Sequence, residues 1–460
     1  MKKILLPLSL LCGLGLSAQA QWVLQNTTNP ETPPGFYGSS IYTVSNDVAW
    51  QLLREGGVAN APVNNFARTA NGGVSWQAGS ITGTNGYQAA NIHAMDANTA
   101  YVAQFGAGGE ILKTTNAGKN WTKVTSSSQY SAPGSFANWV YFFDANNGVT
   151  LGDPTSGYFE VYTTSNGGTT WTRVPSANLP TPLDAHEYGL VGSYFALGNT
   201  IWAGTSHFEA DDATGKPARI LKSTDRGLTW TASSAIPAFG SSGQISAIVM
   251  TDANNGIANN GLTMVYTTDG GTTWQPRTYT GNFGSSDISS VPGTNLIVSV
   301  GPNVASPTSL AQYGSSYSKD NGATWIDIDR NKQYTSVSFA SRTAGYAGSF
   351  TDDTGAGGVY KATATILGTS RNAELQKALA VYPNPSASGV FALTLNSAIK
   401  AGTSVRVFDA LGRQVLSQQL NATAIASQNA TINLSKEKAG LYTLELRTEN
   451  GVAQQKLVIE

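Results

Sequence analysis

Short stretches in which apolar and polar residues alternate follow one another along most of the chain. A period of two places successive side chains on opposite faces of an extended strand, so the pattern predicts β-strands rather than helices. The stretches come in pairs joined by a polar turn, which is typical of hairpins. The seven pairs are Ile41–Leu52, Ile92–Ala103, Val140–Leu151, Phe195–Ala203, Ile248–Ala258, Ile288–Val300 and Val337–Ala347. We therefore expect an all-β protein.

One octapeptide, Ser/Thr-x-Asp/Asn-x-Gly-x-Thr-Trp, recurs six times with small departures. Its glycine supplies the positive φ that a tight turn needs, and its Asp or Asn accepts hydrogen bonds from the turn's own backbone. Its tryptophan packs between neighbouring sheets. The turn-forming residues are Asn71, Asn116, Asn166, Asp225, Asp269 and Asp320, and the packing residues are Trp76, Trp121, Trp171, Trp230, Trp274 and Trp325. The pattern predicts a structural role for these residues rather than a catalytic one.

Successive octapeptide tryptophans lie 44 to 59 residues apart. That spacing is the length of one four-stranded blade of a β-propeller. The seventh hairpin has no octapeptide after it, and Gln21–Gln25 resembles the strands that follow the other octapeptides. We therefore expect this first strand to complete the last blade and remove a free sheet edge.

These repeats resemble the Asp-box, or BNR, superfamily, which includes sialidases, sortilin-type receptors and photosystem II assembly-factor-like proteins. The resemblance covers about residues 21–367 and implies a seven-bladed β-propeller. It does not select a function, because one scaffold carries many activities.

The first 20 residues have the features of a cleavable export signal. Met1–Lys3 is positively charged, Ile4–Leu16 is apolar, and Ala18–Ala20 has the small-x-small pattern of a cleavage site. The apolar run is too short for a transmembrane anchor, so we expect none. Cys12 is the only cysteine, and a lipoprotein signal is the alternative, disfavoured by the bulky Leu11 before it. Cleavage after Ala20 leaves a chain without disulfides or thiolate metal sites.

A different pattern of short strands begins near Leu375. Tyr382–Pro385, the Asp409–Arg413 turn, Gly440–Tyr442 and the 456–460 end resemble the type A C-terminal sorting domain of the Bacteroidetes type IX secretion system. The resemblance implies a small Ig-like β-sandwich at 379–460, after a linker at 368–378. It also implies the type IX machinery as a partner and a secreted or outer-surface location. The alternative is a carbohydrate-binding sandwich.

The charge of the chain argues against nucleic-acid binding. Only 12% of residues are charged, the net charge is −1, and Lys and Arg are scattered. The basic patch that nucleic-acid binding requires is missing. The histidines, His93, His186 and His207, lack metal-ligand spacing, and no phosphate-binding glycine loop opens a helix. We expect a monomer with no cofactor, no metal site and no nucleic-acid partner.

Propeller ligands usually bind on the face formed by the loops between second and third strands and by the links between blades. Candidate ligand-binding residues there are Arg54, His186, His207 and Tyr188. Asp153 and Glu187 form the best carboxylate pair for a secreted glycoside hydrolase. A sialidase is disfavoured because the Arg-Ile-Pro motif of that family is missing. The favoured function is non-catalytic binding of a protein or glycan, with the hydrolase as the alternative.

Overall fold

The computed structural model describes residues 21–25, 35–56, 61–208, 217–240, 243–351, 357–363, 379–395, 403–409, 413–448 and 451–460. The predicted export signal at 1–20 and linker at 368–378 lie outside the described residues. The chain divides after Thr363 into two compact units, each of which is considered by itself. Where the chain is described, it contains no helix that is both long and apolar enough to cross a membrane.

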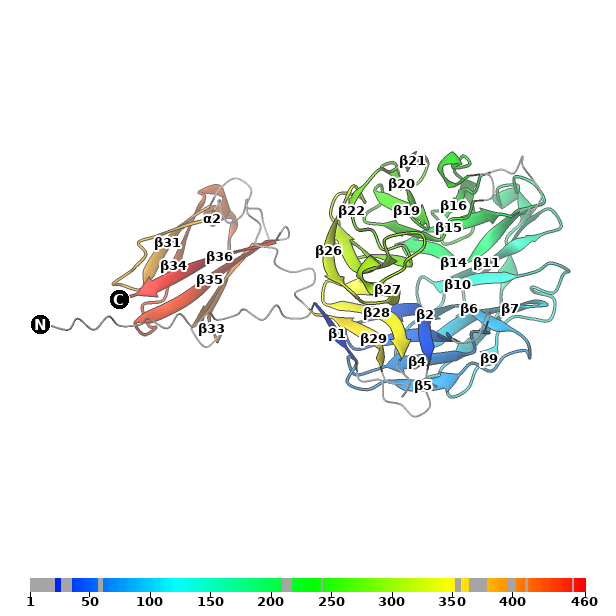
Figure 1. The fold of residues 1–460 in the computed structure, drawn as a ribbon, viewed down its shortest axis with the longest axis horizontal. Helices are drawn as coiled ribbons and strands as arrows, with labels where there is room; N and C mark the ends of the chain where they lie inside the picture. Colours follow the sequence, from blue (N-terminus) through cyan, green and yellow to red (C-terminus); the bar gives the residue numbers. More distant parts are fainter. Residues whose placement is uncertain are drawn as a thin grey trace, which may run out of the picture. The chain divides into compact units, whose positions relative to one another are not determined.

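The first unit is built almost wholly from β-strands in small, mostly antiparallel sheets, as the alternating pattern predicts (Figure 1). Its strands up to residue 207 are β1 (Trp22–Leu24), β2 (Phe36–Thr43), β3 (Ala49–Glu55), β4 (Asn65–Thr69), β5 (Gln77–Ser80), β6 (Gln88–Ala94), β7 (Ala100–Gly106), β8 (Gly108–Thr114), β9 (Thr122–Lys123), β10 (Ala137–Phe142), β11 (Gly148–Thr155), β12 (Tyr158–Thr164), β13 (Thr172–Arg173), β14 (Glu187–Leu197) and β15 (Thr200–His207). The later strands are β16 (Ile220–Ser223), β17 (Thr231–Ala232), β18 (Ala247–Met250), β19 (Gly256–Asn260), β20 (Thr263–Thr267), β21 (Gln275–Pro276), β22 (Thr280–Gly281), β23 (Asp287–Ser290), β24 (Ile297–Pro302), β25 (Tyr313–Ser318), β26 (Thr324–Arg330), β27 (Tyr334–Ser341), β28 (Ala344–Thr351) and β29 (Gly357–Ala362). Short 3-10 turns lie at Ser176–Asn178, Pro237–Phe239 and Leu310–Gln312.

Four sheets follow the chain directly, as β6–β9, β10–β13, β14–β17 and β18–β21. A fifth has the order β22-β26-β25-β24-β23. The remaining strands form one continuous set, β1-β29-β28-β2-β3-β4-β5, in which β27 also pairs with β28. A single pair, Tyr37↔Phe350, joins β2 to β28 and so links the first part of the unit to the last.

The first strand closes the unit. Strand β1 pairs antiparallel with β29, with Trp22 opposite Ala362. Trp22 is 1% exposed, its ring centroid lies 5.6 Å from that of Tyr334, and its indole Nε1 donates to Ser315 Oγ. The predicted pairing of the first strand with the last strands of the propeller is confirmed.

All six octapeptides form the same turn. At Asp269, Oδ1 accepts from Thr273 N at 2.9 Å, Oδ2 accepts from Thr273 Oγ1 at 2.6 Å, and Thr267 Oγ1 accepts from Gly271 N. Gly271 has a φ of +87°, and a Cβ there would lie 2.8 Å from Trp202 Nε1, so glycine alone fits. In the other copies the glycine N–H likewise donates to the Ser or Thr hydroxyl oxygen, and a backbone N–H donates to the Asp or Asn Oδ1.

The octapeptide tryptophans are buried between sheets, with exposed fractions of 4–9%. Trp121 of one sheet packs edge-on against Phe66 of the preceding sheet at 5.8 Å, and Trp50 stacks on Phe66 at 5.3 Å. The core is therefore a series of apolar layers between neighbouring sheets.

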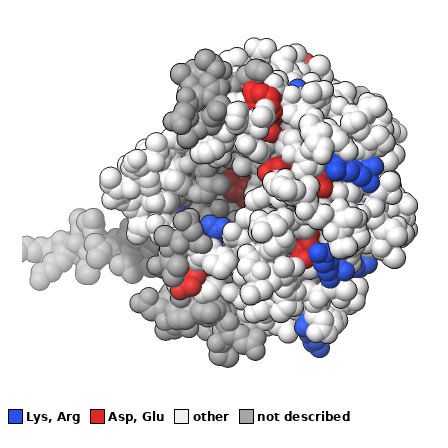
Figure 2. Space-filling model, turned by 90° about the vertical axis from the view of Figure 1, so that its right-hand side faces the viewer, with Lys and Arg blue, Asp and Glu red and all other residues white. Residues whose placement is uncertain are grey.

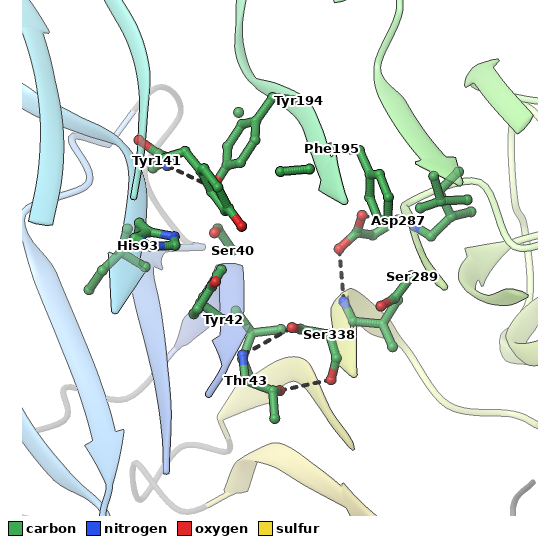
Figure 3. Close-up of a pocket in the computed structure, with 18 of the residues that line it drawn as sticks. Ser40, Tyr42, Thr43, His93, Tyr141, Tyr194, Phe195, Asp287, Ser289 and Ser338 are labelled. Carbon is green, nitrogen blue, oxygen red and sulfur yellow. Dashed lines mark hydrogen bonds between the residues drawn. The ribbon is translucent and has the colours of Figure 1, made fainter. Parts of the chain in front are cut away.

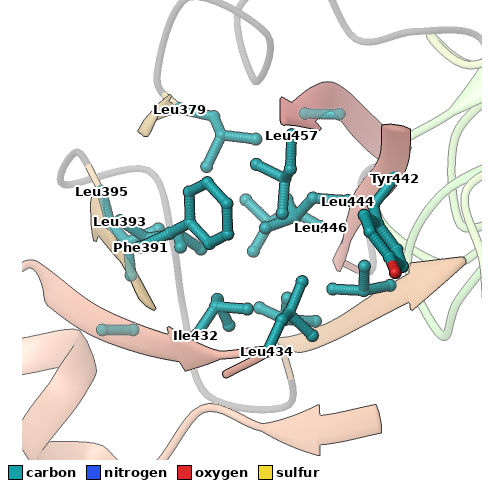
Figure 4. Close-up of a cluster of buried hydrophobic side chains, with 14 of the residues drawn as sticks. Leu379, Phe391, Leu393, Leu395, Ile432, Leu434, Tyr442, Leu444, Leu446 and Leu457 are labelled. Atoms are coloured by element: carbon teal, nitrogen blue, oxygen red, sulfur yellow. The ribbon is translucent and has the colours of Figure 1, made fainter. Parts of the chain in front are cut away.

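The second unit contains two sheets and a short helix, α2 (Ala422–Ala426). One sheet has the order β30-β31-β34 and the other β33-β32-β35-β36. Both sheets contribute to one buried cluster that includes Phe391, Ile432, Leu444 and Leu457 (Figure 4). The strands are β30 (Ala380–Tyr382), β31 (Val390–Thr394), β32 (Ser404–Asp409), β33 (Gln414–Gln419), β34 (Asn429–Asn433), β35 (Gly440–Thr448) and β36 (Gly451–Ile459).

Candidate functional site

A central cavity of about 1000 Å³ lies in the first unit. Residues of β2, β6, β10, β14, β18, β23 and β27 line it, so the inner strand of each successive sheet contributes to its wall. Figure 3 shows Tyr42, Tyr141 and Tyr194, which come from three of these strands, around the same hollow as Asp287 and Ser289.

Aromatic rings and hydroxyls line this wall together with aliphatic side chains. Tyr42, Tyr141, Tyr194 and Phe195 are partly exposed, so their rings are accessible from the cavity. Burial raises the pKa of the three tyrosines above the ordinary value, which keeps their hydroxyls protonated. The cavity therefore offers neutral hydroxyl donors and acceptors beside apolar ring faces.

Charge in the cavity is sparse. Burial lowers the pKa of His93 to about 3, so the imidazole stays neutral. Burial raises the pKa of Asp287 to about 7, although hydrogen bonds from Val337 N and Ile288 N oppose that rise. Among the lining residues that the structure describes, Asp287 carries the sole carboxyl and Arg54, on β3, the sole guanidinium.

The outer surface is also weakly charged. Figure 2 shows blue and red side chains in a few small groups on a largely uncharged face. This view agrees with the net charge of −1 and with the scattered Lys and Arg residues of the sequence.

Glu187 does not line the cavity but lies at the start of β14, with its side chain fully buried. Its two oxygens accept from Arg219 Nε at 2.8 Å and Nη2 at 2.9 Å, and Oε2 also accepts from Leu183 N at 2.7 Å. A carboxylate held by a bidentate guanidinium is committed to that ion pair. Arg219 could not be predicted as its partner, because the two residues meet only in the folded sheet.

Asp153, on β11, is also held by protein groups. Its Oδ1 accepts from Asn138 Nδ2 at 2.8 Å and from Gly189 N at 3.0 Å, which ties β11 to β10 and β14. Burial raises the pKa of Asp153 to about 6, and the hydrogen bonds from Asn138 and Gly189 oppose that rise. The two carboxylates of the predicted pair thus have separate structural partners, and neither lines the cavity.

His186 and His207 meet at the same end of the β14–β17 sheet. Glu187 pairs with His207 in the β14–β15 ladder, and Phe208 N donates to His186 O, so the two imidazoles are neighbours with centroids 6.1 Å apart. Asp184, which the sequence analysis did not select, lies 2.9 Å from His207 Nε2 through Oδ1. The Asp-x-His spacing of Asp184 and His186 before β14 is the sequence signal that could have identified Asp184. Tyr188 follows on β14 and is partly exposed.

Repeated Asp-box turns and small sheets around a central cavity define a β-propeller. Residues 265–276 match the BNR/Asp-box repeat family, and residues 380–460 match the secretion system C-terminal sorting domain family. The chain therefore combines an Asp-box β-propeller with a type IX sorting domain, which indicates export to the outer surface or the medium.

The chain is also similar to several solved structures, of which the first named here supports the propeller fold. YCF48 from Cyanidioschyzon merolae is 16% identical with a TM-score of 0.50, and the match covers 75% of this chain and 99% of that one. A YCF48 structure bound to D1 peptide is 13% identical with a TM-score of 0.49, over 75% and 97% of the chains. PorZ of Porphyromonas gingivalis is 10% identical with a TM-score of 0.36, over 90% and 68%. No curated protein matches the sequence.

Proposed function

We propose that this protein is an exported, seven-bladed β-propeller that binds a neutral glycan in its central cavity without cleaving it. The single observation that carries the proposal is the cavity of about 1000 Å³, with its partly exposed tyrosines and its sparse charge. A cavity of this size suits a short oligosaccharide, because ligand pockets commonly measure roughly 300–1,000 Å³.

The blade count rests on the inner strands. Seven strands, β2, β6, β10, β14, β18, β23 and β27, line the cavity, and each begins a run of strands in chain order. Strand β1 supplies the outer strand of the last run, which supports seven complete blades over 21–367. For the second unit, two sheets around one core support an Ig-like sandwich at 379–460, joined through a linker at 368–378.

The wall of the cavity favours a sugar over a charged ligand. Sugar rings bury their C–H faces on aromatic rings and exchange hydrogen bonds with hydroxyls, and the wall supplies both kinds of group. A strongly charged peptide or nucleotide would leave most of its charge without a partner, because the described wall offers one guanidinium, on Arg54, and one carboxyl, on Asp287, while His93 is neutral.

Binding without cleavage follows from the carboxyl groups. Glycoside hydrolysis ordinarily requires two carboxyl groups on either side of the scissile bond. The described cavity wall holds only Asp287, while Glu187 is occupied by Arg219 and Asp153 by Asn138 and Gly189. No contact of Asp153 or Glu187 favours the hydrolase alternative.

An array of neutral and charged oligosaccharides, probed with the purified protein, tests the ligand class. We expect retention of neutral sugars and a loss of about tenfold or more in affinity for Tyr141→Ala, because buried aromatic contacts dominate binding. Tyr188→Ala is the matched control, since Tyr188 lies on β14 but not on the cavity wall. Binding that Tyr188→Ala abolishes and Tyr141→Ala spares would place the ligand outside the cavity, and release of reducing sugar would overturn the non-catalytic assignment.

Export has its own test. Deleting residues 379–460 should leave a folded propeller in the periplasm, because the sorting domain and the propeller are separate compact units. Fractionation of cells followed by thermal melting of the retained protein measures both parts of this expectation. Surface display of the truncated chain would contradict the role of the sorting domain.

A further inference from the structure

Three side chains at one end of the β14–β17 sheet have the chemistry of a metal site. Asp184, His186 and His207 each place a ligand atom within 4.8 Å of the other two. Two imidazoles and one carboxylate are the donors that Zn²⁺ and related ions bind in proteins. We propose that these residues form a binding site for a divalent transition metal ion, best represented by Zn²⁺. The site is separate from the central cavity, since none of the three residues lines it.

The backbone holds the three donors in place. His186 N donates to Asp184 Oδ1 at 2.9 Å, which fixes the carboxylate beside the first imidazole. Phe208 N donates to His186 O at 3.2 Å, and His207 pairs with Glu187 in the ladder, which fixes the second imidazole. Metal sites depend on such pre-organised ligands, because a loosely held donor must be ordered on binding.

The buried Glu187–Arg219 ion pair holds the segment that carries Asp184 and His186. Leu183 N donates to Glu187 Oε2, so the chain between Leu183 and Glu187 is anchored at both ends by the carboxylate that Arg219 holds. Loss of a residue that supports metal ligands typically lowers metal affinity by about 10–100-fold. In this proposal Glu187 and Arg219 are positioning residues: they hold the segment that carries Asp184 and His186, and they take no part in catalysis.

The distances fit a small rearrangement on binding. His207 Nε2 lies 2.9 Å from Asp184 Oδ1 and 3.0 Å from Oδ2, with the carboxylate facing the ring nitrogen. Ligand atoms about 2.0–2.2 Å from a tetrahedral Zn²⁺ lie about 3.3–3.6 Å from one another. A shift of roughly half an ångström between these two side chains brings them to that spacing, and His186 has its ligand atom within 4.8 Å of both. Three protein ligands also leave a coordination position for water or for a ligand oxygen.

Metal titration of the tag-free, chelator-treated full chain tests the site. We expect one equivalent of Zn²⁺ to bind by calorimetry and one of Co²⁺ to give a visible absorption spectrum. Asp184→Asn and His186→Gln should each weaken Zn²⁺ binding by more than about 100-fold, beyond the roughly 10–100-fold cost of losing a supporting residue. Both residues are partly exposed, so the variants should fold.

His93→Gln is the matched control, because His93 is the one histidine of the chain outside the proposed site and lies in the cavity wall. It should bind Zn²⁺ like the parent chain. A parent that binds no Zn²⁺ or Co²⁺ at millimolar concentration would overturn the proposal. So would Asp184→Asn and His186→Gln variants that melt like the parent and bind Zn²⁺ with unchanged affinity.

Discussion

The two ends of the β14–β17 sheet use polar residues in different ways. At one end, Ser223 and Asp225 form the octapeptide turn that follows β16, and Ser223 pairs with Ile201. At the other end, Glu187 pairs with His207, next to Asp184 and Arg219. The first arrangement occurs six times in the chain, with the same bonds at the same positions. The second occurs once in the part of the chain that the structure describes.

This difference distinguishes residues that stabilise the fold from residues that are candidates for binding a ligand. A polar group that recurs in every octapeptide performs a task that every hairpin needs, which is to satisfy the backbone N–H groups of a tight turn. A cluster that occurs once in the propeller meets no such common need. Buried charge that is not required by the repeat costs desolvation energy, so its retention points to a local task. Polar residues that recur in every repeat are thus structural, and polar residues that occur in a single blade are the candidate site residues.

Removing one partner of the buried ion pair should have the largest effect on stability. Glu187→Gln leaves the guanidinium of Arg219, itself largely buried, without its counter-charge, and we expect a loss of about 3 kcal/mol in the free energy of unfolding. Urea unfolding followed by tryptophan fluorescence measures it. Arg330→Gln is the control, because Arg330 pairs with the more exposed Asp327 and should cost less than about 1 kcal/mol. Equal losses of unfolding free energy in the two variants would contradict the prediction that the buried pair matters more than the exposed one.

Single octapeptide variants should have a smaller effect. Asp225→Ala removes acceptors for Thr229 N and Thr229 Oγ1, at an expected cost of about 1–2 kcal/mol. Asp320→Ala should cost the same, and the double variant should show the sum within about 0.5 kcal/mol, because the turns share no partners. Asp225→Asn is the control supplied by the chain itself, since Asn71 forms the same bond to its backbone. The idea fails if the Ala variants melt like the parent but lose the ligand.

The sequence predicted the parts of the fold that depend on local chemistry. The octapeptide specifies its own turn, so its positions were readable without the structure, and the match of Trp22 to the octapeptide tryptophans led to the pairing of β1 with β29. Of the residues on the cavity wall, only Arg54 was among the predicted ligand-binding candidates. Inner-strand residues such as Tyr42 and Asp287 line the central cavity because of how the sheets are arranged around it. The alternation of apolar and polar residues along one strand does not specify that arrangement.

The site was predicted only in part, for the same reason. His186 and His207 were selected because they lie at the expected ends of strands, but the spacing along the chain gave no metal motif. Asp184 reaches His207 across 23 residues, and Arg219 reaches Glu187 across 32, through pairing of β14, β15 and the start of β16. Glu187 was assigned to a catalytic pair from its place near the inner strand of the fourth blade, and its counter-ion Arg219, just before β16, could not be read from the sequence.

Acid should separate the octapeptides into two groups, with the smallest expected effect. Three copies carry Asp225, Asp269 and Asp320, whereas the copies nearer the N-terminus carry Asn71, Asn116 and Asn166. Burial alone would raise the pKa of Asp269, but hydrogen bonds from Thr273 and Thr267 outweigh it and lower the pKa to about 2. The pKa values of Asp225 and Asp320 are lowered in the same way.

A carboxyl whose pKa is lower in the folded state stabilises the fold at pH above its unfolded value, which is about 4 for Asp. That contribution is lost as the pH falls through the folded value, so the aspartate turns should weaken between about pH 4 and pH 2. Asparagine does not titrate. Amide hydrogen exchange should therefore accelerate in this window at Thr229, Thr273 and Thr324, relative to the exchange at Ser75, Asn120 and Thr170, after correction for intrinsic rates. In the triple variant Asp225→Asn/Asp269→Asn/Asp320→Asn the difference should vanish, and its persistence there would show that the turns owe their acid response to something other than these carboxylates.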